Sequence, residues 1–148
     1  SPALDLESRN SNIVKALYKA LTAHGDTEAI ARLLASHLEW HYHGPPDCQY
    51  MMRKLTGQSR DMEIRFKPRT IMAVGDQRVI VEGWNGPKAY WVHVWTLKDG
   101  IITQLREYFN TWLAVIVVVP EDQNAILLWQ SEPRKSLNCS LPNLVLAI

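Results

Sequence analysis

The sequence predicts an α+β protein in which two or three N-terminal helices pack on a curved antiparallel sheet around one apolar pocket. Apolar residues recur at helical spacing before residue 35, and strand-like segments joined by tight turns fill the chain from residue 62 onward. The helices and the strands do not alternate along the chain. Alternation would indicate a parallel βαβ arrangement, whereas segregation of this kind indicates an α+β fold.

The N-terminal part of the chain predicts a helical hairpin. Residues 1–10 lack periodicity and are expected to form a flexible arm, so the single domain is expected to span 11–148. Ser11 is a candidate helix N-cap, Gly25 a candidate helix end, and Asp26 a candidate cap for the next helix. The apolar stripes of the two helices consist of Ile13, Leu17, Ala20 and Leu21, and of Ile30, Leu33 and Leu34.

The rest of the chain predicts strands. The segment 38–44 alternates, so that Leu38, Trp40 and Tyr42 share one face and Glu39, His41 and His43 share the other. A short helix follows at 50–55. Four long strands are then expected at 62–74, 78–84, 88–97 and 101–119, with the hairpin signal Asn85-Gly86 between the second and third. Residues 125–130 fit either a helix or a strand, and the apolar C-terminal end at 141–148 is expected to dock on the domain.

The charge composition argues against a nucleic-acid-binding protein. The chain has 16 Lys and Arg against 15 Asp and Glu, whereas a nucleic-acid-binding protein usually has a basic excess. The cluster of Arg60, Arg65, Lys67 and Arg69 is therefore interpreted as a solvated strand edge.

The apolar run 112–119 is far shorter than the ~20 residues of a membrane helix. No signal peptide is recognised, and Cys48 and Cys139 are expected to be free thiols, so the expected location is cytoplasmic and also nuclear.

Three aromatic or heterocyclic side chains share one face of the strand expected at 88–97. Trp91, His93 and Trp95 alternate with Val92 and Val94. An imidazole is costly in a plain apolar core, which favours a pocket for a flat or ring-containing apolar ligand. The alternative is that the two Trp side chains are core residues or dimer contacts.

Four sequence stretches together resemble one plant family. They are Glu39-Trp-His-Tyr-His-Gly-Pro-Pro46, Tyr90-Trp-Val-His-Val-Trp95, Arg106-Glu-Tyr-Phe-Asn-Thr-Trp112 and the ending Leu-Pro-Asn-Leu-Val-Leu-Ala-Ile. In these stretches the chain is similar to the plant wound-induced and senescence-associated proteins. The resemblance implies membership of the cone-fold superfamily of nuclear transport factor, ketosteroid isomerase and SnoaL-like cyclases. It implies a deep pocket, a homodimer through the outer sheet face, and a role in stress and senescence, with no established reaction.

A comparison with ketosteroid isomerase implies three catalytic candidates. Tyr18 stands at the distance before Gly25-Asp26 at which that enzyme has its catalytic Tyr. His41 takes the place of its general-base Asp before a Gly, and His93 takes the place of its protonated Asp. A neutral imidazole can accept a proton near neutral pH, and a buried Tyr hydroxyl can stabilise an oxyanion. The alternative is that each imidazole only satisfies a buried carbonyl group.

Further side chains are candidates for lining the pocket. They are His43, Glu82, Trp84, Trp91, Trp95, Tyr108 and Asn110. SnoaL-like and epoxide-hydrolase relatives often carry Asp at the position of Asn110, and an amide cannot replace an acid or a base. His41 and His43 have a spacing able to chelate zinc with Glu82 or Glu107, but a zinc site needs more ligands. No metal and no cofactor are expected.

Two functions remain open at this point. The first is a stress-responsive protein whose pocket binds a small apolar molecule, with acid/base chemistry by Tyr18, His41 and His93. The second is a non-enzymatic dimeric protein-interaction module, and a weaker third is a dimeric scaffold with a vestigial pocket. An open pocket favours the first, an interior filled by Trp84, Trp91 and Trp95 favours a scaffold, and an exposed apolar patch favours an interaction module.

Overall fold

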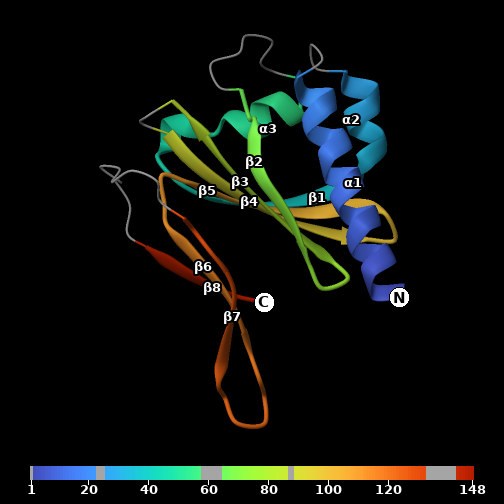
Figure 1. The fold of residues 1–148 in the computed structure, drawn as a ribbon. Helices are drawn as coiled ribbons and strands as arrows, with labels where there is room; N and C mark the ends of the chain where they lie inside the picture. The colour runs from blue at the N-terminus through green and yellow to red at the C-terminus, as the bar shows by residue number, and fades with distance from the viewer. Residues whose placement is uncertain (1, 23–25, 58–64, 87–88, 133–142) are drawn as a thin grey trace.

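The computed structural model describes residues 2–22, 26–57, 65–86, 89–132 and 143–148. In chain order the elements are α1 (Pro2–Thr22), α2 (Thr27–Leu33), β1 (Leu34–His43), the 3-10 helix η1 (Pro46–Cys48), α3 (Tyr50–Leu55), β2 (Pro68–Val74), β3 (Arg78–Asn85), β4 (Ala89–Lys98), β5 (Ile101–Phe109), β6 (Leu113–Val118), β7 (Ala125–Gln130) and β8 (Leu144–Ala147). Apart from β1, which comes before η1 and α3, the helices precede the strands of a curved sheet, and the predicted α+β class is confirmed (Figure 1).

The main sheet has five strands in the order β1-β5-β4-β3-β2. The strands β2 to β5 form an antiparallel meander, as expected, but β1 pairs with β5 in parallel. The prediction of a fully antiparallel sheet was therefore wrong at this edge. Side-chain alternation fixes which face a residue occupies, but it carries no information about strand direction.

Two apolar clusters lie on opposite faces of the main sheet. On the face that we call the inner face, α1 and α2 pack against the sheet through residues such as Val14, Leu17 and Ile30. On the outer face, a second sheet of three strands in the order β7-β6-β8 packs against β3, β4 and β5. The outer face, which the family resemblance implied as a dimer surface, is thus covered in part by this chain's own C-terminal strands (Figure 1).

The first helix starts earlier than predicted. The flexible arm expected over 1–10 is helical from Pro2, so Ser11 lies inside a helix and is not its cap. Proline suits the first helical position because its fixed φ matches the helix, and Asp5 in the first turn complements the helix dipole. Asn10 is buried, and its Nδ2 donates to the Asp76 carbonyl oxygen at 2.8 Å, which ties this part of α1 to the sheet.

The strand expected over 101–119 is two strands. β5 ends at Phe109, Asn110 adopts a positive φ of 52°, and β6 starts at Leu113 on the second sheet. Residues 125–130, for which helix and strand were both open, form β7. The C-terminal residues form β8, which runs parallel to β6. The predictions for Gly25, Arg60, the strand start at 62 and Cys139 lie outside the described residues.

Candidate functional site

The inner face of β4 carries the polar centre of the molecule. Trp91, His93 and Trp95 all point from this strand toward α1, and the exposed fraction of each is 0%. Tyr18, on the buried stripe of α1, reaches the same place and is 3% exposed. Its ring stacks on the rings of Trp91 and His93 with centroids about 6 Å apart. Helix and strand therefore bring Tyr18 and His93 into direct contact.

A chain of hydrogen bonds runs through this centre. Tyr18 Oη lies 2.5 Å from His93 Nδ1, and His93 Nε2 lies 2.9 Å from Oε2 of the fully buried Glu107 on β5. The two ends of the chain are closed by indoles. Trp95 Nε1 donates to Tyr18 Oη at 2.9 Å, and Trp40 Nε1 on β1 donates to Glu107 Oε1 at 3.3 Å. Four elements, α1, β1, β4 and β5, thus contribute to one buried network.

One placement of the hydrogen atoms gives every polar group of this network a hydrogen-bond partner. Because an ionised Glu107 can only accept, the His93 hydrogen belongs on Nε2, and Nδ1 is left to accept from the Tyr18 hydroxyl. A doubly protonated imidazole would direct a second N–H at Tyr18 Oη, which already accepts from Trp95. The phenol hydrogen would then have no acceptor in the network. The geometry therefore favours a neutral His93 between a phenol donor and a carboxylate.

The Tyr18 hydroxyl is held in its neutral form. Burial raises the pKa of Tyr18 well above its ordinary value of 10.0, the hydrogen bond from Trp95 partly offsets this, and the charge of Glu107 raises it further. A phenol with such a pKa acts as a hydrogen-bond donor rather than as a base. Between Tyr18 and His93, the imidazole is consequently the side chain that offers a lone pair, on Nδ1.

Aromatic rings pack closely around His93. The Phe66 ring lies 5.1 Å from Trp91 and 5.0 Å from His93, measured between centroids. A Cβ atom at Gly83 would overlap the Trp91 ring and the Lys67 carbonyl, so this strand position requires glycine. Trp91 Nε1 is buried and has no hydrogen-bond partner among the residues that the structure describes. The interior around His93 is filled by these rings, with one indole donor left unused.

His41 does not join the network. It lies on the outer face of β1, opposite to Tyr42, with its side chain 52% exposed and its Nε2 3.7 Å from Glu39 Oε2. Hydrogen bonds from Gln104 and His41 hold the pKa of Glu39 below its usual value. The expected convergence of Tyr18, His41 and His93 is therefore wrong for His41, because the strand alternation places it on the other side of the sheet.

The predicted lining residues divide between the two faces. Trp91 and Trp95 belong to the inner site, whereas Glu82, Trp84 and Tyr108 lie on the outer face. The Glu82 carboxylate accepts from the Tyr90 hydroxyl and, at 3.3 Å, from the backbone nitrogen of Glu132. This outer cluster is a separate polar centre that does not communicate with His93 through any hydrogen bond of the described residues.

His43 and Asn110 also lie away from the inner site. His43 pairs with Tyr108 in the sheet register, and its ring centroid lies 6.4 Å from that ring. Asn110 has a structural role, because its backbone nitrogen donates to the Tyr90 carbonyl oxygen and its Oδ1 accepts from the Tyr90 nitrogen at 2.8 Å. Both contacts fix the turn between β5 and β6.

Three side chains of the inner site were not among the predicted site residues: Trp40, Phe66 and Glu107. For Glu107 the sequence does hold a signal. It shares a strand face with Leu105 and Phe109, so a lone carboxylate interrupts an apolar stripe. Phe66 follows the segment 58–64, which lies outside the described residues, and no local pattern assigns it to the site.

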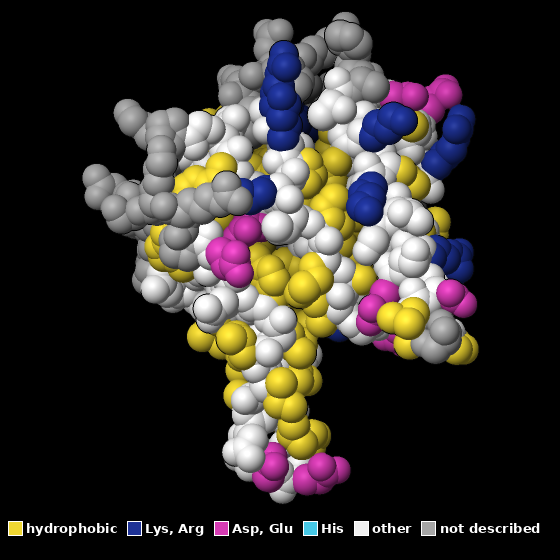
Figure 2. Space-filling view, in the orientation of Figure 1, with side chains coloured by type: hydrophobic (Ala, Val, Ile, Leu, Met, Phe, Trp, Pro, Cys, Tyr) yellow, Lys and Arg dark blue, Asp and Glu magenta, His cyan; other side chains and the backbone are white. Residues whose placement is uncertain are grey.

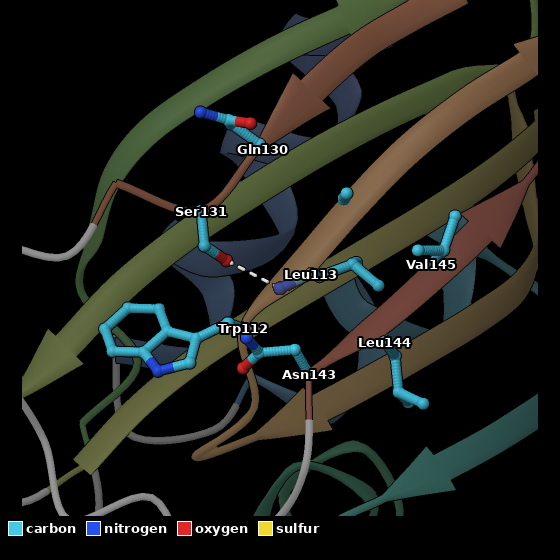
Figure 3. Close-up of a pocket in the computed structure, with 8 residues that line it drawn as sticks. Trp112, Leu113, Gln130, Ser131, Asn143, Leu144 and Val145 are labelled. Atoms are coloured by element: carbon cyan, nitrogen blue, oxygen red, sulfur yellow. Dashed lines mark hydrogen bonds between the residues drawn. The ribbon is translucent and has the colours of Figure 1, made fainter. Parts of the chain in front are cut away.

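An open groove lies elsewhere, on the second sheet. Its volume is about 520 Å³. It is lined by Trp112, Leu113, Ala114, Gln130, Ser131, Asn143, Leu144 and Val145. Ser131 Oγ accepts from the backbone nitrogen of Leu113 at 2.9 Å within this groove (Figure 3).

Metal and membrane features are limited in the part of the chain that the structure describes. No three His, Cys, Asp or Glu side chains gather there as a set of metal ligands. Of the helices described, none combines the length and the apolar character needed to cross a membrane.

Comparison with known proteins identifies the family. Residues 52–148 match the family described as wound-induced protein WI12. The chain belongs to this family. It is 38% identical over 106 residues to wound-induced protein 1 of Solanum tuberosum, which covers 66% of this chain and 100% of that protein. It is 32% identical over 111 residues to senescence associated gene 20 of Arabidopsis thaliana, again over 66% of this chain and all of that protein. The resemblance stated from the sequence motifs is thus confirmed.

Solved structures place the WI12-family chain in the NTF2-like fold. An NTF2-like protein from Burkholderia xenovorans is 24% identical, with a TM-score of 0.54 over 70% of this chain and 90% of that one. An LEH-like epoxide hydrolase from M. tuberculosis is 22% identical, with a TM-score of 0.51 over 70% of this chain and 84% of that one. At these identities the likeness establishes the cone fold and leaves the chemistry to the residues themselves.

The WI12 match divides the inner site into two parts. His93 and Glu107 lie within the matched residues 52–148, whereas Tyr18 and Trp40 lie before them. The phenol donor of the network and the indole that binds the carboxylate therefore come from a part of this chain outside the family match.

Proposed function

We propose that this protein of the plant wound and senescence response binds a small, largely apolar, ring-containing molecule at the inner site. The observation that supports this proposal is the buried chain from Tyr18 through His93 to Glu107. Burying a carboxylate, an imidazole and a phenol in an apolar interior is costly, and an apolar core of the same volume is often as stable. Ionisable groups arranged in this way are typical of functional sites.

A ligand would enter at the aromatic wall. Phe66 packs edge-to-face on Trp91 and at a tilt on His93, so a ligand ring would take its place while keeping the same aromatic contacts. The unused indole N–H of Trp91 would then donate to a polar atom of the ligand. The preferred ligand thus has a flat apolar body with one hydrogen-bond acceptor, such as a carbonyl oxygen.

The same groups would support proton transfer on a carbonyl compound. Because Tyr18 retains its proton, its hydroxyl would turn from His93 to the ligand oxygen and stabilise negative charge there, together with Trp95 Nε1. His93 Nδ1, released from Tyr18, would accept a proton from the carbon next to the carbonyl, and Glu107 would stabilise the imidazolium. Returning that proton to another carbon gives an isomerisation that requires no cofactor.

The test is a thermal-shift screen of plant apolar metabolites on the wild type and on Phe66→Ala. A ligand at 100 times its Kd should add about 2.7 kcal/mol to the free energy of unfolding. Phe66→Ala, which empties the aromatic wall, should bind the hits more tightly, and His93→Gln should bind them more weakly. Met72→Ala, at a 36% exposed position of β2, is the control. Equal shifts in all variants, or no hit in wild type and Phe66→Ala, would refute the inner site.

A second function, a non-enzymatic dimeric interaction module, is favoured by a different observation. Trp91 and Trp95 fill the interior, while apolar side chains remain exposed on the second sheet. We infer that the protein associates with itself through that sheet. Light scattering across a range of concentrations tests this function, because a monomer at all of them would contradict it and leave the inner-site proposal untouched.

A further inference from the structure

The second sheet extends beyond the body of the molecule. Its hairpin of β6 and β7, residues 113–130, projects away from the main sheet, and we call it the arm (Figure 1). The inner end of the arm adjoins the groove described above, because Leu113 and Gln130 line that groove. Its far end is the turn that contains Glu121 and Asp122.

The arm exposes apolar side chains on both faces. Ile126 is 50% and Leu127 53% exposed, and as neighbours on one strand they point to opposite faces. Val118 on β6 is 43% exposed, and Val145 on β8 is 67% exposed. Figure 2 shows hydrophobic side chains along the arm and acidic ones at its tip. Leu113 and Val115 at the base of the arm are buried against the main sheet, whereas the outer part of the hairpin is stabilised little by its own packing.

The edges of this sheet lack the charged residues and prolines that commonly protect edge strands against pairing. Within the described residues, β7 and β8 each pair only with β6, so one backbone edge of each is unpaired. Natural edge strands are protected by Lys, Pro, inward-pointing charges or covering segments. Neither β7, Ala125–Gln130, nor β8, Leu144–Ala147, contains a charged residue or a proline. Such an edge is suited to accept another strand.

We propose that the occupant is a second copy of this chain, with the two arms antiparallel and β7 paired with the β7 of the partner. A two-fold arrangement of this kind is closed at β7, so every contact is made twice, and the unpaired edges that remain are those of the four-residue strand β8. The absence of charge in β7 means that self-pairing brings no like charges together. This inference rests on the dimeric function proposed above and assigns its surface.

An antiparallel arrangement of the arms also brings acidic and basic side chains of the two copies toward each other. They bring the tip of each arm, with Glu121 and Asp122, to the base of the partner's arm, where Trp112 lines the groove. Trp112 packs on Trp84 with centroids 6.2 Å apart, and the Arg69 guanidinium lies over the Trp84 ring at 5.9 Å. The Arg69 cation is therefore linked to the groove-lining Trp112 through the Trp84 ring, at the base that would receive the acidic tip.

The first experiment places a lysine on the arm edge and measures association by sedimentation velocity. Leu127→Lys and Ile126→Lys should each raise the dimer Kd by about 100-fold, because a charge is introduced twice per dimer. Leu6→Lys, at a 39% exposed position of α1, should leave the Kd unchanged. A monomeric wild type would overturn both the dimer and the arm, whereas a dimer that persists in both arm variants would overturn the arm alone.

The second experiment tests the contact between tip and base by charge exchange. Glu121→Arg and Arg69→Glu should each raise the dimer Kd by about tenfold, and the double variant should return it to within about threefold of wild type. Glu121 is chosen over Asp122 because Asp122 accepts hydrogen bonds from Asn124 that shape the turn. Single variants without effect, or a double variant as weak as the sum of both, would overturn the antiparallel arrangement.

Discussion

Individual hydrogen bonds determine how the side chains of the inner site are oriented. From Trp95 through Tyr18 and His93 to Glu107, each donor points toward the carboxylate, and Trp40 binds the carboxylate from the other side. A carboxylate that accepts two N–H groups in a dry interior is paired and oriented. Removal of any member leaves its neighbours without a partner in a place that water does not reach.

Tyr18→Phe is expected to lower the free energy of unfolding by about 1–3 kcal/mol, because the phenyl ring fills the same space while His93 Nδ1 and Trp95 Nε1 lose their partner. Urea unfolding followed by fluorescence measures the change. A loss below about 0.5 kcal/mol would show that the hydrogen bonds of Tyr18 contribute no net stability.

The double variant of Tyr18→Phe and Trp95→Phe separates the shared bond from the packing. Both single variants lose the same 2.9 Å hydrogen bond, so the double variant should cost about 1 kcal/mol less than the sum of the singles. Additive losses would mean that the two side chains act independently, against the network described above.

At this scale, the comparison with ketosteroid isomerase predicted Tyr18 and His93 together, and strand alternation added Trp95, but Glu107 and Trp40 were not among the predicted site residues. Strand alternation alone separates His41 from Trp40 and Tyr42, yet which face is the inner one depends on the pairing of β1 with β5. Glu107 pairs across the sheet with both His93 and Tyr42, a relation that no local pattern contains. The catalytic role of Tyr18 and His93 stays a prediction.

Among the elements, the junction of β5 and β6 determines where the second sheet can form. Asn110 takes a positive φ of 52° and binds both backbone groups of Tyr90, so the strand turns out of the main sheet at this residue. The sequence from 101 to 119 was predicted as one strand because β-branched, apolar and aromatic residues occur on both sides of the turn and no Gly or Pro marks it. Asn is a residue that tolerates this backbone conformation, but its presence in a strand-like run is a weak signal.

Two substitutions isolate the backbone contribution of Asn110. Asn110→Gly and Asn110→Ala both lose the hydrogen bond from the Tyr90 nitrogen, but only alanine carries a Cβ at positive φ. We expect Asn110→Ala to be less stable than Asn110→Gly by about 1 kcal/mol in thermal or urea unfolding. Equal stabilities would mean that the turn relaxes to another conformation.

The early start of α1 is a second case in which context outweighs pattern. Leu4 and Leu6 are 64% and 39% exposed, so the first turns of the helix have no buried stripe that a periodicity analysis could detect. The buried Asn10 contact with Asp76 becomes visible only when β2 and β3 are in place. Helical stripes predict the buried part of a helix, and they do not predict turns that extend past the core.

For the whole molecule, buried phenols predict sensitivity to alkali. Burial is the largest cause that raises the pKa of Tyr18, Tyr42, Tyr90 and Tyr108 above the ordinary value of 10.0. The folded state therefore holds these protons more tightly than the unfolded state. Their contribution to stability is complete below about pH 10 and declines as the pH rises toward the folded pKa values, because only the unfolded phenols ionise there.

The free energy of unfolding in urea is accordingly expected to fall between about pH 9 and pH 11. Absorbance at the phenolate band should show that these four tyrosines of the native protein remain neutral at about pH 10.5 and ionise together with unfolding. Native tyrosines that all titrate with a midpoint near 10 would contradict their burial.

The parallel pairing of β1 with β5 also has a consequence for synthesis on the ribosome. Glu39 and Gln104 are partners in this ladder, 65 residues apart in the chain. At about 5–20 residues per second, β1 waits about 3–13 s after its own translation before β5, its strand neighbour among the described residues, is made. During that interval Trp40 and Tyr42 have no strand to pair with, so their aromatic side chains are exposed for longer than those of strands that pair with a sequence neighbour.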